Sequence, residues 1–337
     1  MVMFYAFLSR YQHQSGVEQA DTTIAMKLDV MSRFFTPLRH LLVPLLFWIL
    51  PSLPLSGDTI TLRPIADTSI FEKGPDNNLG AMQSMAAGNT ATPDPARALM
   101  RFNIHAALPA GAIITSASLQ LPIVRTSAFA GPATFNLHRL IVDWGEGNKG
   151  ADLVTGIGAL ASEGEATWEA RFHGQHAWTA PGGSAGMDFI AQASASADVS
   201  GTLTLAFNST ADLVADVQSW LDDPDNNFGW LLKDQFESTG TTARRFGSRE
   251  HPTDQPQMVL EYDSPLAIDH TSLVEGLFCM AFSARAGKTY TLERREKVNS
   301  GNWEVIATRA PSASNAEAVL CDTISTLESR FYRIGEQ

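Results

Sequence analysis

The segment SASLQLPIV, residues 116–124, alternates polar and apolar side chains along most of its length. A period of two places successive side chains on opposite faces of a strand, so that one face is buried and the other is in water. Comparable runs recur across residues 57–263, separated by clusters of Gly, Pro, Asn and Asp: TITLRPIA, RALMRFNI, TFNLHRLIV, GTLTLAF, GWLLKD and PQMVLEYD. Short strands with turns between them predict an all-β domain, an antiparallel jelly-roll β-sandwich.

One segment of this domain has helical spacing instead. In STADLVADVQSWLDD, residues 209–223, the apolar side chains Leu213, Val217 and Trp220 fall on one helical face, and a serine or threonine at the start can cap the helix. We therefore expect one short helix. Trp220 on its apolar stripe and Trp230 at the start of the next strand are expected in the core.

The string PDNNxG occurs twice, at residues 75–80 and 224–229. It could mark a repeat, a pair of calcium loops, or one turn chemistry used twice. Around the second copy, Asp223, Asp225 and Asn227 have the one-three-five spacing of calcium ligands, but the sixth position holds an aromatic residue instead of glycine and a strand follows. We favour tight turns, because Asn, Asp, Gly and Pro are the residues that such turns select.

The N-terminal residues 1–56 contain a basic stretch followed by LLVPLLFWILPSLPLS. This order is typical of a secretory signal peptide, and the apolar core is too short to span a bilayer stably. We expect a secreted or cell-surface protein that is not inserted in the membrane after cleavage. The net charge of −12 disfavours nucleic acid and anionic membranes as partners.

Residues 264–337 contain further short apolar runs, namely LFCMAFSA, TYTLERRE, NWEVIATR, EAVLCDTI and RFYRIG. They predict a second, small β-sandwich of the fibronectin or immunoglobulin type that serves as a spacer or attachment unit. Both cysteines of the chain, Cys279 and Cys321, lie here. In an exported chain an even pair predicts one disulfide bond, with two buried thiols as the alternative.

Several strings occur in an order that resembles a DNRLRE-type domain: ADTSIFE, NNLGAMQSM, ARALMRFNI, ITSASLQLPI, FNLHRLIVDWGEG, ATWEARFHGQHAWTAPGG, VADVQSWLDDPDNNFGWLLK and FGSREHPTDQPQMVLEYD. That family is also described as a carbohydrate-binding module family with alginate-binding members, related to modules beside archaeal disaggregatases. The resemblance implies a jelly roll that binds polysaccharide. The C-terminal unit resembles small secreted β-domains through Tyr290, Leu292, Trp303 and the string Phe331-Tyr332-Arg333, which implies no activity.

A basic cluster offers a ligand-binding surface. Guanidinium groups bind carboxylates through two parallel hydrogen bonds, so an acidic polysaccharide is a sensible ligand. The predicted binding residues are Arg244, Arg245 and Arg249, joined by Arg97, Arg101, Arg139 and Lys233 if neighbouring strands align, with Trp168 and Trp178 as exposed rings for stacking on sugars. The alternative is that the arginines pair with acids in surface salt bridges of little consequence.

Two groups of residues could form a metal site. Asp67 and Glu250 are placed along the chain so that they could help to hold one structural calcium ion between the first and last strands. His138, His173 and His176 could in principle bind zinc, but their spacing establishes no convergent geometry, and loop histidines are the favoured interpretation.

The string GGSAG, residues 182–186, fits a nucleophile pattern that works only on a sharp turn between a strand and a helix. Its neighbours supply neither element, so we expect a loop and assign no catalytic residue. The sequence favours a secreted, non-catalytic polysaccharide-binding protein. The alternatives are an adhesive or structural surface protein with a cell-surface partner, and a polysaccharide lyase or hydrolase, which would need a deep cleft.

Overall fold

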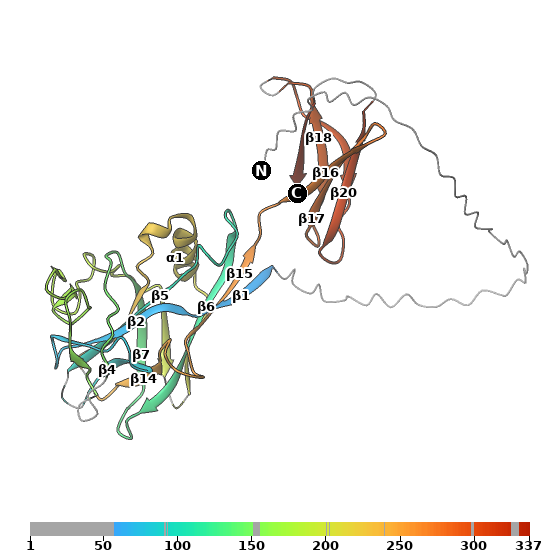
Figure 1. Ribbon diagram of the computed structural model, residues 1–337. Coiled ribbons are helices and arrows are strands. Elements are labelled where there is room, and N and C mark those ends of the chain that lie inside the picture. Colours follow the sequence, from blue (N-terminus) through green and yellow to red (C-terminus); the bar gives the residue numbers. More distant parts are fainter. Residues whose placement is uncertain are drawn as a thin grey trace, which may run out of the picture. The chain divides into compact units, whose positions relative to one another are not determined.

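The computed structural model describes residues 57–90, 92, 94–150, 156–199, 201, 203–238, 240–297, 300–324 and 330–337. The predicted signal peptide, in residues 1–56, lies outside these described residues. The chain divides into two compact units, one spanning Ser56–Pro265 and one containing Leu266–Gln337. The predicted boundary after residue 263 lies close to this division. Figure 1 shows the larger unit in blue to orange and the smaller one in red-brown.

The larger unit is built almost entirely of antiparallel strands, as the alternating sequence predicts. The strands are β1 (Asp58–Leu62), β2 (Pro64–Phe71), β3 (Asn77–Asn78), β4 (Ser84–Asn89), β5 (Pro95–Phe102), β6 (Ile113–Thr126), β7 (Ala133–Arg139), β8 (Ala159–Leu160), β9 (Ala170–Phe172), β10 (His176–Ala177), β11 (Ala195–Val199), β12 (Thr204–Phe207), β13 (Trp230–Asp234), β14 (Arg244–Gly247) and β15 (Gln257–Asp263). Within the described residues the one α-helix is α1 (Ala211–Asp222), followed by a 3₁₀ turn, η1 (Pro224–Asn226). No helix in the described part of the chain is long and apolar enough to cross a membrane.

The main sheet curls so that two parts of it pack face to face across a core. One part has the order β1-β15-β6-β12 and the other the order β2-β5-β13-β7-β11, while the neighbouring strands β14 and β4 connect β6 to β5. Buried side chains of both parts form one cluster, with Leu119 and Leu121 from β6 and Met100, Phe135 and Leu137 from the other part. The predicted all-β sandwich is confirmed.

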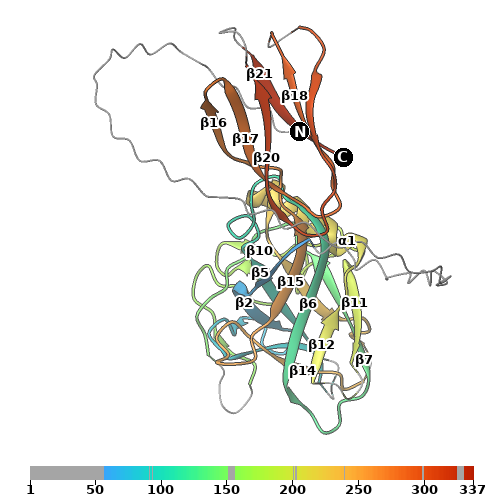
Figure 2. The same ribbon diagram turned by 90° about the vertical axis from the view of Figure 1, so that its right-hand side faces the viewer.

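Strand β6 is the centre of this arrangement. Gln120 pairs with Gln257 of β15 on one edge and with Ala206 of β12 on the other, and Figure 2 shows β6 between these two strands. Beyond residue 122 the strand pairs with β14 instead. The alternating side chains of the segment 116–124 are buried at every apolar position from Ala117 to Ile123, as a period of two requires.

Helix α1 begins where the sequence predicts. The hydroxyl of Thr210 accepts a hydrogen bond from the backbone N–H of Leu213 at 3.0 Å, which caps the first turn. Trp220 and Trp230 are fully buried, with ring centroids 4.5 Å apart, and the indole N–H of Trp230 donates to the Asp216 carboxylate at 2.8 Å. Both tryptophans are therefore core residues, as predicted.

The segment between β7 and β11 covers the outer face of the β2-β5-β13-β7 part of the sheet. Its buried side chains include Trp144, Trp168, Trp178 and Phe189, which pack against Leu99 and Leu231 of the strands. Strands covered on both faces do not need alternating side chains, and β2 and β13 are indeed buried at nearly every position.

Both PDNNxG strings are structural turns. In the first, the amide nitrogen of Asn78 donates to the carbonyl oxygens of Glu146 (2.8 Å) and Ala166 (2.9 Å), and in the second that of Asn227 donates to Phe102 (2.7 Å). Gly229 has a φ of 76°, and a Cβ there would lie 2.0 Å from the carbonyl oxygen of Met100. Asparagine binds metal ions through its side-chain oxygen, and the Oδ1 of Asn78 already accepts from the backbone N–H groups of Gly80 and Lys149. These contacts support the turn interpretation for the first string.

The smaller unit is a second β-sandwich. Its strands are β16 (Ile268–Val274), β17 (Leu277–Ala284), β18 (Tyr290–Arg295), β19 (Glu304–Arg309), β20 (Ala316–Thr323) and β21 (Phe331–Glu336). They form two three-stranded sheets, β16-β17-β20 and β19-β18-β21, which share one buried cluster that includes Phe282, Tyr290 and Leu292. Cys279 and Cys321 lie directly opposite each other on β17 and β20 and form a disulfide bond.

Replacing Asn78 by alanine is expected to destabilise the larger unit by about 3 kcal/mol, because it leaves buried backbone groups without partners. The measurement is the urea midpoint followed by tryptophan fluorescence. The matched control is Asn226→Ala, an exposed residue whose side chain donates only to Asp223 Oδ2. Equal shifts in the two variants would contradict the structural role of Asn78.

Removing the disulfide with Cys279→Ser and Cys321→Ser is expected to destabilise the smaller unit by about 4 kcal/mol, from the entropy of closing a loop of 42 residues. Calorimetry with and without reductant measures this change. The larger unit contains no cysteine, so its transition serves as the internal control. A shift of both transitions together would overturn the assignment of the effect to one unit.

Candidate binding site

The predicted basic surface on β5 and β13 is neutralised. Arg97 Nε and Nη2 each lie 2.7 Å from the carboxylate of Glu237, and Lys233 Nζ lies 2.9 Å from the same group. The guanidinium of Arg97 also covers the ring of Trp168, 5.0 Å from its centroid. Arg97 and Lys233 are therefore corrected from ligand-binding residues to members of an internal ion-pair cluster.

Arg101 and Arg139 are used in the same way. Arg101 Nη1 lies 2.9 Å from Asp143, and its guanidinium stands 5.6 Å from the ring centroid of Trp144. Arg139 Nη1 lies 3.6 Å from Asp216, with its guanidinium 5.6 Å from the ring centroid of Trp220. Each of these arginines pairs with an acid and packs on a tryptophan, which leaves little of its charge for a ligand.

The expectation that Trp168 and Trp178 are exposed is wrong. Each is only 5% exposed, because the segment that carries them packs on the outer face of the sheet. The indole N–H of Trp178 donates to the carbonyl oxygen of Thr167 at 2.8 Å. Neither ring is available to stack on a sugar.

Arg249 lies among three carboxylates. Its backbone N–H donates to Asp67 at 2.7 Å, and its Nε lies 2.5 Å from Glu146 and 2.9 Å from Glu250. The predicted calcium ligands Asp67 and Glu250 thus do lie near each other, but the guanidinium of Arg249 supplies the positive charge. Throughout the described residues no three His, Cys, Asp or Glu side chains are arranged to hold a metal ion, which also argues against the histidine site.

This cluster perturbs the protonation of Asp67. Burial raises the pKa of Asp67 to about 8, and the negative charges of Glu250 and Glu146 add to the rise, against the hydrogen bond from the Arg249 backbone. Asp67 is therefore largely protonated at neutral pH. This is a structural consequence of burying a carboxyl group of β2 without a full counter-charge.

Arg244 is a structural residue. It is buried, and its guanidinium donates to the carbonyl oxygens of Gly131 at 2.6 Å and Thr242 at 2.8 Å. These bonds fasten the turn between β6 and β7 to the start of β14. Arg244 therefore supports this end of the sandwich, and it also contributes to the lining of the pocket described below.

Arg245 differs from the other predicted arginines. It points outward from β14, directly opposite Arg125 of β6. Its Nη2 donates to the carbonyl oxygen of Gly156. Its buried Nη1 has no hydrogen-bond partner among the described residues, which is also true of the Nε groups of Arg101, Arg139 and Arg244. Burial lowers the pKa of Arg245, and the positive charge of Arg125 lowers it further. Like charges directly opposite each other on paired strands are destabilising, and an anion between them would remove that cost.

The two arginines line a pocket of about 610 Å³ on the outer face of β4, β14 and β6. Its apolar lining includes Phe71, Ala86, Ala96 and Ile157, which belong to a small buried cluster of their own. The polar and charged side chains of the described lining are Lys73, Thr90, Asp94, Arg125, Thr126, Ser127 and Arg245, together with the structural Arg244.

The acid in that lining is already engaged. Asp94 accepts a hydrogen bond from the Thr92 hydroxyl at 2.6 Å and lies 3.6 Å from Lys73. The Thr92 bond and the charge of Lys73 lower the pKa of Asp94, which therefore stays ionised. With Lys73 balanced by Asp94, the described lining keeps the positive charge of Arg125 and Arg245, together with that of the structural Arg244.

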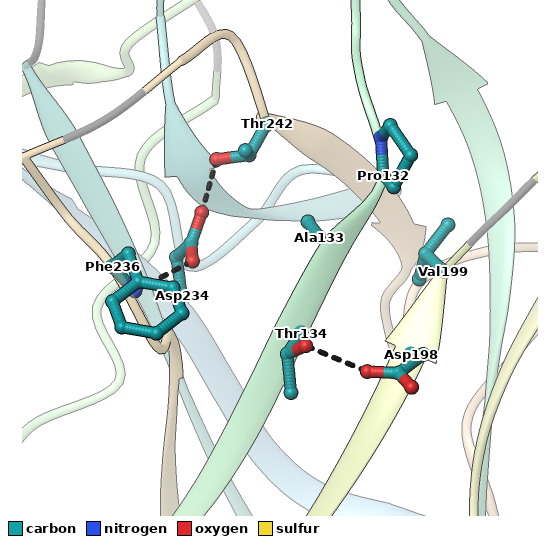
Figure 3. Close-up of a pocket in the computed structure, with 8 residues that line it drawn as sticks. All are labelled: Pro132, Ala133, Thr134, Asp198, Val199, Asp234, Phe236 and Thr242. Atoms are coloured by element: carbon teal, nitrogen blue, oxygen red, sulfur yellow. Dashed lines mark hydrogen bonds between the residues drawn. The ribbon is translucent and has the colours of Figure 1, made fainter.

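A second pocket, of about 410 Å³, has a different chemistry. It is lined by Pro132, Ala133, Thr134, Asp198, Val199, Asp234, Phe236 and Thr242, which Figure 3 shows as sticks. Asp198 accepts from the Thr134 hydroxyl at 2.6 Å, and Asp234 accepts from the Thr242 hydroxyl. Its described lining holds carboxylates and hydroxyls and no basic side chain, so it does not suit an anion.

Sequence reasoning missed Arg125 and Lys73. Arg125 directly follows the alternating segment 116–124, at a position that a strand would turn toward solvent, but its pairing with Arg245 depends on a register that joins distant parts of the chain. The string GGSAG lies in a loop with no helix after it, which confirms the loop prediction for Ser184.

No protein-family model matches this chain, and no curated protein matches it. The resemblance to DNRLRE-type domains rests on the quoted sequence strings.

The raised pKa of Asp67 predicts how stability varies with pH. A carboxyl group that holds its proton more tightly in the folded state adds stability below its unfolded pKa of about 4, and that stability is lost as the pH rises toward about 8. In Asp67→Asn the free energy of unfolding should therefore decline less as the pH rises. Chemical denaturation at pH 4 to 9 measures this change. Asp225→Asn, at an exposed site, is the control, and parallel curves for the wild type and Asp67→Asn would refute the assignment.

Proposed function

We propose that this protein binds an acidic polysaccharide without cleaving it, and that a carboxylate of the ligand lies between Arg125 and Arg245. The observation that carries the proposal is the cross-strand pair of guanidinium groups in a pocket, one of them with a buried N–H group that lacks a partner among the described residues. A planar carboxylate offers two acceptors to two such donors.

The rest of the pocket suits a sugar. Phe71, Ala86 and Ile157 provide an apolar lining for the C–H face of a ring, while Thr90, Thr126 and Ser127 provide hydroxyls that exchange hydrogen bonds with those of a carbohydrate. Arg245 is itself held in place by the Gly156 carbonyl oxygen and by the ring of Phe71, 6.0 Å away. A donor that is fixed before binding loses less conformational entropy when the ligand arrives.

The acidic side chains in the described lining of this pocket favour a binding role over catalysis, because they are too few for a glycosidase. A glycosidase requires two carboxyl groups that flank the scissile bond. In the described lining the carboxylate is Asp94, which is hydrogen-bonded to Thr92 and close to Lys73. The N-terminal sequence accords with an exported protein that meets polysaccharide outside the cell.

Replacing Arg245 or Arg125 by glutamine is expected to weaken the binding of acidic polysaccharide about tenfold or more, because each removes a charge-assisted donor. Calorimetry against alginate, pectin, chondroitin and a neutral glucan, at low and high salt, measures this loss. Each variant should also show a smaller dependence of affinity on salt than the wild type.

The control is Arg63→Gln, which removes one exposed positive charge outside the pocket and should leave affinity unchanged. The proposed site would be refuted if the wild type bound only neutral glucan, or if Arg63→Gln and Arg245→Gln lost equal affinity for acidic polysaccharide. Binding to no glycan at all would favour an adhesive role.

A further inference from the structure

The second pocket contains an exposed aromatic ring on a rigid turn. Phe236 is 60% exposed at the end of β13, yet its backbone is fixed at both ends. Its N–H donates to the buried carboxylate of Asp234 at 2.9 Å, and its carbonyl oxygen accepts from the side chain of Asn89 at 3.0 Å. Isolated exposed apolar residues are common, but a rigidly presented ring at the rim of a pocket is a contact surface prepared for a ligand.

The opposite side of this pocket carries the polar groups of Asp198 and Thr134, and Figure 3 shows them across the opening from the Phe236 ring. Asp198 accepts from the Thr134 hydroxyl with Oδ1, and its other oxygen is placed to accept from a hydroxyl of a ligand. An aromatic face on one side and hydrogen-bond acceptors on the other match an uncharged sugar ring, which has an apolar face and a rim of hydroxyls. The same carboxylates would repel an acidic sugar.

The two pockets are lined by neighbouring residues of the same two hydrogen-bonded segments, residues 88–90 and 242–243. Gly88 and Thr90 line the arginine pocket, and Asn89 between them holds the carbonyl oxygen of Phe236. In the segment just before β14, Thr242 lines the Phe236 pocket and Ala243 lines the arginine pocket. The N–H groups of Thr242 and Ala243 both donate to the carbonyl oxygen of Asn89 at 2.9 Å. The binding surfaces therefore lie side by side and are fixed relative to each other.

We infer that the Phe236 pocket is a second sugar subsite for an uncharged unit of the same chain, so that the ligand is a polysaccharide containing both acidic and neutral sugars. This inference rests on the proposed function, because the arginine pocket must take the acidic unit. It narrows the ligand class: a polymer composed only of uronic acids would place a carboxylate against Asp198 and Asp234.

The test compares two sets of oligosaccharides of equal length, one of alternating glucuronic acid and N-acetylhexosamine and one of uronic acids alone. The wild type should bind the alternating set more tightly. Phe236→Ala should weaken binding of the alternating set roughly five- to tenfold, as expected when an aromatic ring that the ligand covers is truncated. The affinity for the uronic acid set should not change. Phe236→Tyr, which keeps the ring, should retain the wild-type affinity.

The matched control is Phe129→Ala. Phe129 is 88% exposed on the turn between β6 and β7 and lines neither pocket, so its removal should not change affinity. If Phe236→Ala binds both sets like the wild type while Arg245→Gln binds them weakly, the second subsite is refuted and the proposed function stands. If Arg245→Gln binds both sets like the wild type, the proposed function fails and this inference fails with it.

Discussion

The side-chain amide of Asn78 is the constraint on which the outer layer of the larger unit depends. The segment between β7 and β11 lies on a sheet face, where its backbone groups need partners other than water. The buried Asn78 donates to Glu146 and Ala166 of that segment and accepts from Lys149 and from Gly80. Because one side chain joins several loop positions to β3, the loops become a fixed layer that contributes Gly156 and Ile157 to the arginine pocket.

Much of the fold was predictable from local patterns. The period of two over residues 116–124 determines which side chains of β6 enter the core, and the period of 3.6 over α1 does the same for Trp220. Such patterns predict the buried side chains correctly where an element has one buried face, because polar and apolar residues then alternate with the period of that element. The bounds of α1 follow from the capping chemistry of Thr210 and the stop at Pro224.

The outer layer and the arginine pocket were not predictable, since they depend on which distant residues meet. Trp168 has no periodic neighbours, and only the packing of its segment on the sheet shows that it is buried beneath Arg97. A basic residue gives no sign in the sequence of whether it will meet an acid: Arg97 meets Glu237, whereas Arg245 meets Arg125. The sequence suggested guanidinium groups as the donors for an acidic glycan, and the strand register places Arg245 of the predicted set opposite a second arginine, in the proposed site.

The charge of the whole protein also limits the kind of polysaccharide that would fit the arginine pocket. A net charge of −12 repels an anionic polymer at distances within which salt does not screen it, about 8 Å at physiological ionic strength. That repulsion grows with the charge density of the polymer, while the attraction comes mainly from Arg125 and Arg245. A chain with widely spaced carboxylates therefore gains the local attraction at a lower electrostatic cost than a densely charged one. In the proposed second subsite, the carboxylates of Asp198 and Asp234 would impose the same preference at short range.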